Sequence, residues 1–250
     1  MLTPLRAALI TPALFCLALL TLLPAHGQAA PLKGSGKSAT ETRNLPEFQA
    51  ITMTGSMDLV MRQGAQSVQV MADDNLLPML ETLVENTSQG ATLVVRWKKG
   101  KGFTGYSTQN RVLITVVVPK LSALVTSGSG DMSVESFNTP ALKLSISGSG
   151  DAKLAGLTAG ELSIAISGSG DVGGSGTAGK LKIGIAGSGD VKLTDMKAED
   201  VTVSIAGSGD AAVNASKTLN VSIAGSGDVT YTGNAQVKSS VAGSGKVKRK

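Results

Sequence analysis

The chain is poor in aromatic residues, cysteine and histidine, and each shortage restricts how it can fold and act. Phe, Trp and Tyr make up 3% of its 250 residues, so a core must be built from aliphatic side chains. The single cysteine and single histidine, Cys16 and His26, both lie in an N-terminal segment that resembles an export signal. Removing that segment leaves no disulfide, no Ser-His or Cys-His catalytic pair, and no zinc site with nitrogen or sulfur ligands.

The N-terminus has the three parts of a secretory signal. Arg6 provides a basic start, Ala13 to Leu20 form an unbroken apolar run, and small residues follow between Gly27 and Ala30. Proline lies on both sides of the run, which argues against a membrane span of about 20 apolar residues. We therefore predict a signal peptide over residues 1–29, export to the bacterial periplasm or cell surface, and no transmembrane span after cleavage.

Glycine is abundant, and much of it lies in one repeated tetrapeptide that we call the corner. Gly-Ser-Gly-Asp begins at Gly128, Gly148, Gly168, Gly187, Gly207 and Gly225. A seventh copy begins at Gly243 and has Lys246 in place of aspartate. The steps of 20, 20, 19, 20, 18 and 18 residues match one coil of a solenoid. They are too short for a propeller blade or a helical-pair repeat.

Apolar residues alternate with small or polar residues on both sides of each corner, as they do in half-buried strands. Before the corners the apolar residues include Leu142, Leu144, Ile146; Leu162, Ile164, Ile166; Leu181, Ile183, Ile185; Val201, Val203, Ile205; and Leu219, Val221, Ile223. A shorter alternation follows each corner. Residues typical of turns then form the predicted returns Glu135–Ala141, Ala155–Gly160, Thr194–Asp200, Asn214–Thr218 and Thr232–Gln236.

These patterns predict an all-β chain whose residues 121–247 form a β-solenoid of about seven coils, followed by a basic tail at 248–250. Its ends need caps, because an end coil exposes unpaired backbone. The outward positions before the corners carry unusually small side chains: Ser147, Ser167, Ala186, Ala206, Ala224 and Ala242, and next to them Ser145, Ala165, Gly184, Ser204, Ser222 and Ser240. This small-residue face is either a solvated surface or a surface that packs on a sheet, a second chain or a ligand.

The region before the solenoid lacks the corner motif. Residues 30–45 are expected to be a flexible linker, and residues 46–120 an irregular β region that caps or continues the solenoid. Its candidate strands are Phe48–Met53, Met57–Met61, Val68–Met71, Thr92–Trp97 and Val112–Val118. Asp73–Val84 is expected to be irregular or a short helix, and Gly100–Gly105 an exposed loop rich in lysine and glycine.

Two motifs that suggest nucleotide or nucleic-acid binding fail on their context. Gly34-Ser35-Gly36-Lys37-Ser38 imitates the end of a phosphate-binding loop, but Pro31 occupies the position of the loop's first glycine and no buried strand precedes it. The basic tail is short and no basic stripe is interleaved with aromatic residues, so nucleic acid is not an expected partner.

The aspartates of the corners are the remaining candidates for chemistry: Asp131, Asp151, Asp171, Asp190, Asp210 and Asp228. A glycosidase needs an acid and a base in different environments, whereas repeated aspartates have similar ones. The motif also fits calcium-binding repeats poorly. We expect each aspartate to accept hydrogen bonds from backbone N–H groups at its corner, with a cation ladder as the alternative. No catalytic, cofactor-binding or metal-binding residue is assigned.

The export signal, the β region ending near Val116-Val117-Val118-Pro119, and the serial Gly-Ser-Gly corners together resemble a bacterial family. The closing segment from Gly225 to Gly245 is similar to that family's ending. It is the family described as putative auto-transporter adhesin, head GIN domain. The resemblance covers about residues 48–247 and implies a right-handed β-helix-like domain in the cell envelope. It brings no catalytic residues and no cofactor.

The sequence therefore predicts a non-enzymatic envelope protein with an adhesin-like role, which contacts a glycan or protein at the cell surface. Two alternatives stay open. One is a structural scaffold that self-associates through the small-residue face. The other is a polysaccharide-active β-helix enzyme that uses the corner aspartates.

Overall fold

The protein is described by a computed structural model over residues 31–98 and 105–250. The predicted signal peptide and most of the loop predicted at 100–105 lie outside the described residues. Within the described residues the chain is almost entirely β-strand, with one 3-10 helix at Leu77–Met79. No helix in this part of the chain has the length and apolar character needed to cross a membrane.

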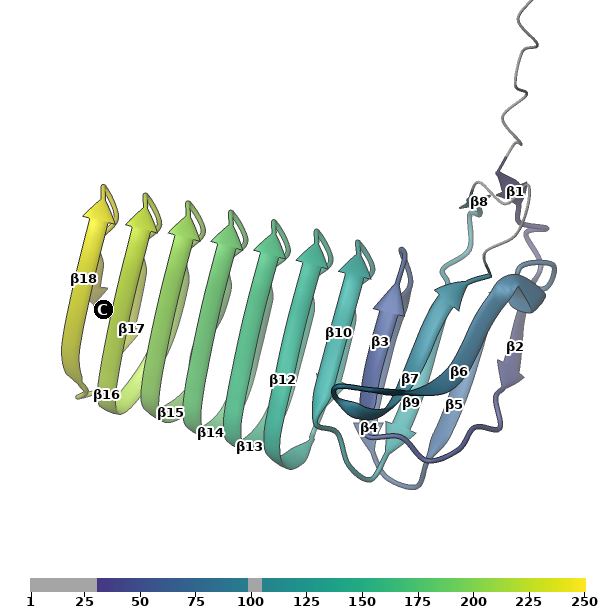
Figure 1. The fold of residues 1–250 in the computed structure, drawn as a ribbon, viewed down its shortest axis with the longest axis horizontal. Helices are drawn as coiled ribbons and strands as arrows, with labels where there is room; N and C mark the ends of the chain where they lie inside the picture. The colour runs from purple at the N-terminus through teal and green to yellow at the C-terminus, as the bar shows by residue number, and fades with distance from the viewer. Residues whose placement is uncertain (1–30, 99–104) are drawn as a thin grey trace, which may run out of the picture.

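The C-terminal half is a β-solenoid, as predicted from the repeat. Strands that lead into the corners stack in parallel and in register, so that Ile146 pairs with Ile166, and Ile185 with Ile205. Figure 1 shows this row of side-by-side strands. Its members are β10 (Ala123–Gly128), β12 (Asn138–Gly148), β13 (Ala152–Gly168), β14 (Val172–Gly187), β15 (Val191–Gly207), β16 (Ala211–Gly225) and β18 (Gln236–Gly243).

A second row of parallel strands follows the corners. It consists of β4 (Asp58–Gln63), β11 (Met132–Glu135), the first residues of β13 to β16, β17 (Val229–Thr232) and β19 (Val247–Arg249). The two rows face each other across a core of aliphatic side chains. The isoleucines expected to stack there, from Ile146 to Ile223, are each at most 3% exposed. The alternation therefore identified the inward positions.

The predicted returns differ from the structure in three coils. β13, β15 and β16 each run without a break from one corner to the next, over 17, 17 and 15 residues. Predicted turns at 155–160, 194–200 and 214–218 therefore lie inside strands. Every return pairs with the returns of neighbouring coils, so the chain bends at register shifts, such as the one between Leu154 and Leu157, instead of leaving the sheet. Breaks are confirmed only between β11 and β12 and between β17 and β18.

The N-terminal region both continues and caps the solenoid. β3 (Ala50–Thr54) pairs in parallel with β10, and β4 pairs in parallel with β11. Beyond them, β7 (Gly90–Trp97) and β9 (Leu113–Val118) extend the two rows. β5 (Ser67–Asp73) and β6 (Leu80–Thr87) then pair antiparallel with β9 and β7. The five predicted strands match β3, β4, β5, β7 and β9 with ends shifted by one or two residues, whereas β6 was not predicted.

The segment expected to be a linker is ordered instead. β1 (Leu32–Lys33) pairs in parallel with β8 (Tyr106–Ser107), and β2 (Ser38–Thr42) pairs antiparallel with β5 over five residues. The expectation of a flexible linker was wrong over these strands, because the free edge of β5 supplies backbone partners that composition does not reveal.

The C-terminal end of the solenoid has no such cover among the described residues. β16 lies on one side of β18, and no strand is paired with its other edge. Val237 and Val241 on β18 are the large hydrophobic side chains that are exposed in the described part of the chain. Lys238, Lys246 and Lys248 surround them in sequence, and lysine on an open edge opposes pairing with another chain.

The strands that lead into the corners have a buried face and an exposed face, and an added charge should affect stability differently on each. Ile205 is 1% exposed, so Ile205→Asp would bury an unpaired carboxylate and should destabilise the fold by several kcal/mol. Ser204 points outward and is exposed, so Ser204→Asp should change stability by less than about 1 kcal/mol. Urea unfolding of both variants checks this. Equal destabilisation would show that the outward face is buried against a partner.

Candidate functional site

The corners bring successive coils unusually close together. At each corner the serine N–H donates to the carbonyl of the first glycine of the preceding coil, as Ser208 does to Gly187 at 2.9 Å. The first glycine has a positive φ, 140° at Gly207, which disfavours residues with a Cβ. A Cβ on the second glycine, Gly209, would lie 2.2 Å from the carbonyl oxygen of Gly189. Both glycines are therefore needed for stacking.

All six predicted aspartates lie in one row along these corners, which we call the aspartate ladder. Each Oδ1 accepts a hydrogen bond from the backbone N–H of the fourth residue of the next corner: Asp131 from Asp151 at 3.2 Å, Asp151 from Asp171 at 2.9 Å, Asp171 from Asp190 at 2.8 Å, Asp190 from Asp210 at 3.0 Å, Asp210 from Asp228 at 2.7 Å, and Asp228 from Lys246 at 2.8 Å. The expected acceptor role is confirmed, but the donor belongs to the next coil and not to the same corner.

The ladder has a first member that the repeat did not reveal. Asp58 accepts the backbone N–H of Asp131 at 2.8 Å, and its corner reads Gly55-Ser56-Met57-Asp58. The corner was missed because Met57 replaces the second glycine and 73 residues separate it from the next copy. The signal that could have found it was the Gly-Ser pair followed two residues later by aspartate.

Basic side chains offset part of the ladder's negative charge. Lys192 Nζ lies 3.7 Å from Asp171 Oδ2 and 3.5 Å from Asp190 Oδ2, and Arg111 pairs with Asp58. In residues 31–98 and 105–250, no group of three His, Cys, Asp or Glu side chains is arranged to hold a metal ion. The hydrogen bonds thus occupy Oδ1 of each aspartate, and the ion pairs offset the charge of Asp58, Asp171 and Asp190.

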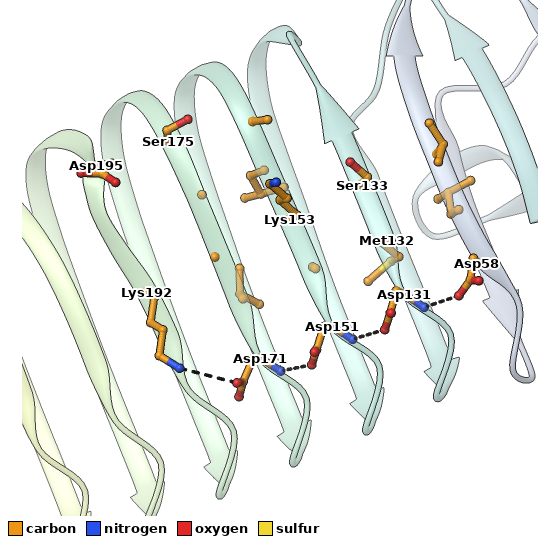
Figure 2. A pocket seen from close by; sticks show the side chains of 18 of the residues that line it. Asp58, Asp131, Met132, Ser133, Asp151, Lys153, Asp171, Ser175, Lys192 and Asp195 are labelled. Carbon is orange, nitrogen blue, oxygen red and sulfur yellow. Dashed lines mark hydrogen bonds and ion pairs between the residues drawn. The ribbon is translucent and has the colours of Figure 1, made fainter.

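A groove of about 720 Å³, which we call the ladder groove, runs beside the aspartate ladder. Figure 2 shows the row of Asp58, Asp131, Asp151 and Asp171 along one side, with Ser133, Ser175 and Asp195 toward the other. Lys153 and Lys192 lie between the two sides. The groove thus crosses β4, β11, β13, β14 and β15, whose residues Val60, Ser133, Lys153, Gly173 and Lys192 are register partners.

The floor of the groove lies where the repeat is broken. Neighbouring coils have Lys153-Leu154 and Lys192-Leu193 one residue after the corner, but β14 has Gly173-Gly174 at the same place. A Cβ on Gly173 would meet no atom closer than 3.9 Å, so this position opens to the groove. At Gly174 the side chains of Leu154 and Leu193 close the space, so the core stays filled. The hollow is therefore on the outside of the coil.

The small-residue face is the second candidate surface, on the opposite row of strands. Its outer positions, such as Ser147 and Ala206, are exposed in the structure. A shallower hollow of about 400 Å³ lies over them where β14 places Gly184. Among the described residues this face carries neither an ion pair nor a side-chain hydrogen bond at Gly184 or its neighbours Ala165 and Ser204, so it has less polar chemistry than the ladder groove.

The loop that imitates a phosphate-binding motif binds a carboxylate of the protein itself. Gly36 N–H donates to Asp73 Oδ2 at 3.3 Å, and Ser35 N–H donates to Asn75 at 2.9 Å. Asp73 is 1% exposed, and hydrogen bonds from Asn110 and then Thr108 hold its pKa below the ordinary value. A phosphate at this loop would meet the negative charge of Asp73, which agrees with the rejection of nucleotide binding.

The acceptor role of the ladder makes a prediction that separates it from cation binding. Asp190→Asn keeps an acceptor for the Asp210 N–H and should be mild, whereas Asp190→Ala leaves that donor unpaired and should cost about 1–3 kcal/mol. EDTA and millimolar calcium should leave the melting temperature of the wild type unchanged. A calcium-dependent rise of several degrees, absent with magnesium and reduced in Asp190→Asn, would instead establish a cation ladder.

Comparison with solved structures finds the same fold in several bacterial proteins. A putative lipid binding protein of Parabacteroides distasonis has 27% identity and a TM-score of 0.72, and the match covers 88% of this chain and 100% of the other. A putative adhesin of Bacteroides fragilis has 24% identity and a TM-score of 0.78, with the same coverage. A putative adhesin of Parabacteroides merdae has 22% identity and a TM-score of 0.68, covering 88% and 98%.

No curated protein sequence matches the chain. A family model does match it, over residues 47–235, which include the N-terminal cap and the corners from Gly128 to Gly225. The matched region is most of the chain and contains the aspartate ladder and the whole ladder groove. The chain therefore belongs to the family described as putative auto-transporter adhesin, head GIN domain.

Proposed function

We propose that this protein is an exported, non-enzymatic surface-interaction module of the bacterial envelope, and that the ladder groove is its contact surface. The observation that carries this proposal is the coincidence of the groove with the break in the repeat at Gly173-Gly174. A binding site has to differ from the scaffold around it, and most of the other coils keep a side chain where Gly173 has none.

Membership of a family of adhesin domains supports a surface role, and the signal-like N-terminus supports export to the periplasm or cell surface. The similar Parabacteroides distasonis protein is described as lipid binding and the Bacteroides fragilis protein as an adhesin. Both descriptions name binding or adhesion, which is the kind of role proposed for this chain.

The chemistry of the ladder supports a role without catalysis. Successive carboxylates each use Oδ1 to accept a backbone N–H, so they share the same principal hydrogen bond, and among the described residues only Asp58, Asp171 and Asp190 also have a basic partner. Glycoside cleavage requires two carboxyl groups whose environments separate their pKa values. The equivalent aspartates of the ladder are therefore better suited to holding a ligand than to protonating one.

An attachment assay tests the proposed function. Deleting the gene should reduce attachment of the bacterium to its natural surface, and the wild-type gene should restore it. A gene encoding Ile205→Asp should not restore attachment, because that variant loses the folded core. Fractionation of the same cells should find the protein outside the cytoplasm, shortened by 27 to 30 residues.

Three outcomes would contradict the proposal. Unchanged attachment of the deletion strain would remove the surface role. Release of reducing sugar by the purified protein would make it a polysaccharide-active enzyme. The third outcome is a concentration-dependent dimer that Ser204→Asp abolishes and on which attachment depends. That result would favour a self-associating scaffold, with the small-residue face as the contact surface.

A further inference from the structure

We infer that the ladder groove binds a neutral, hydroxyl-rich glycan in an extended conformation. Tyr106 would contact the end of the glycan that lies nearest the N-terminal cap. This inference rests on the proposed function and goes beyond it by naming the ligand class and the residues that select it. Three features carry it: the hydrogen-bonding state of the ladder, the bare floor at Gly173, and a second hollow that continues the groove.

The ladder leaves hydrogen-bond acceptors free for a ligand, but no donors. Oδ1 of each carboxylate is occupied by a backbone N–H, while Oδ2 of Asp131 and Asp151 makes no hydrogen bond or ion pair within the described residues. An ionised carboxylate only accepts hydrogen bonds, so the ligand has to donate them. Sugar hydroxyls are such donors, whereas a polyanion would meet a row of like charges.

The opposite side of the groove adds hydroxyls that can both donate and accept, and a lysine between the two sides adds a donor. Ser133 and Ser175 contribute hydroxyls there, and Lys153 has an exposed ammonium with no ion pair in the described structure. Hydroxyl-bearing ligands can accept from Lys153 while donating to the aspartates across the groove. Because Gly173 has no side chain, a sugar ring can lie close to the sheet between these two sides.

A second hollow, of about 580 Å³, continues the groove toward the N-terminal cap. It shares Asp58 and Arg111 with the ladder groove and is also lined by Trp97 and Tyr106. The two rings lie 4.1 Å apart between centroids, and the Tyr106 hydroxyl donates to the Ser56 carbonyl at 2.8 Å. The ring is thus fixed in place, and burial raises the pKa of Tyr106.

This pairing of rings is notable because aromatic residues are so scarce in the chain. The only tryptophan and one of two tyrosines lie beside the groove, although the core of the solenoid contains almost none. Tyrosine and tryptophan combine a broad apolar face with a polar edge, which suits the apolar C–H face of a sugar ring. A glycan can therefore stack at this end and donate hydrogen bonds along the ladder.

The spacing of the groups fits a polymer with a regular repeat. Coils that stack as parallel strands advance by about 4.8 Å, which is close to the length of one hexose unit in an extended chain. Each coil from Asp58 to Asp171 presents one carboxylate, so consecutive sugar units would meet equivalent acceptors. Affinity should therefore rise with oligosaccharide length until the ligand spans the groove.

Calorimetric titration of the mature full-length protein with cellohexaose, chitohexaose and mannohexaose tests this inference, with hexagalacturonic acid as the anionic comparison. At least one neutral hexasaccharide should bind, more tightly than its own trisaccharide and more tightly than hexagalacturonic acid. Gly173→Gln should weaken this binding at least about tenfold by filling the floor. Tyr106→Ala should also weaken it, by removing the stacking surface.

Gly184→Gln is the matched control, because Gly184 lies on the same strand, faces the small-residue face, and has the same 3.9 Å clearance at its Cβ. It should bind the glycan as the wild type does, and thermal unfolding should show all variants folded. Wild-type affinity in folded Gly173→Gln would overturn the inference, as would tighter binding of the anionic ligand or no binding of any neutral hexasaccharide. If one of these results is found but attachment still depends on the gene, the proposed function stands and only the inferred ligand class is wrong.

Discussion

Close backbone approach at the corners is the constraint on which the rest of the structure depends. The second glycine of each of the six Gly-Ser-Gly-Asp corners is buried and leaves no room for a Cβ, which at Gly189 would lie 2.1 Å from the carbonyl oxygen of Gly170. Because every coil meets its neighbour at this point, the strands on both sides are held in the same register. Inward side chains then stack like on like, and a core of small aliphatic residues suffices without disulfides.

The aspartate ladder solves a problem that this close approach creates. At a corner the serine N–H donates to a backbone carbonyl of the preceding coil, whereas the N–H of the fourth residue donates to a side chain. The carboxylate of the preceding coil supplies this acceptor, at 3.0 Å between Asp190 and Asp210. A charged acceptor makes a stronger hydrogen bond than a neutral one. Lys246 at the seventh corner accepts nothing from a further coil, so the ladder ends there.

Sequence alone predicted what the period and the alternation determine. The corners, the inward apolar positions and the family could be predicted because each coil repeats similar residues at nearly constant spacing. The sequence did not show which coil donates the hydrogen bond to each aspartate, because a bond within a corner and a bond between coils require the same residues. β2 was missed because Ser38–Thr42 alternates weakly and is ordered by pairing with β5. The returns were misassigned because turn-forming residues also tolerate bends inside a paired strand.

The candidate site was harder to predict because it is a departure from the repeat. Gly173-Gly174 replaces a lysine-leucine pair, and in sequence that change looks like one more glycine-rich stretch. Only the stacking of β13, β14 and β15 shows that Gly173 opens outward while Leu154 and Leu193 fill the core behind it. The continuation of the groove to Tyr106 was equally hidden, because it depends on residues far apart in the chain.

Unfolding of two single-methyl variants tests the central role of the corners most directly. Gly189→Ala places a Cβ 2.1 Å from a neighbouring carbonyl, whereas Gly184→Ala on the same strand has 3.9 Å of clearance and neither position requires a positive φ. Gly189→Ala should lower the melting temperature steeply or prevent folding, and Gly184→Ala should leave it unchanged or raise it slightly. Similar melting temperatures for the two variants would contradict the account, because the corners would then not fix the stacking of the coils.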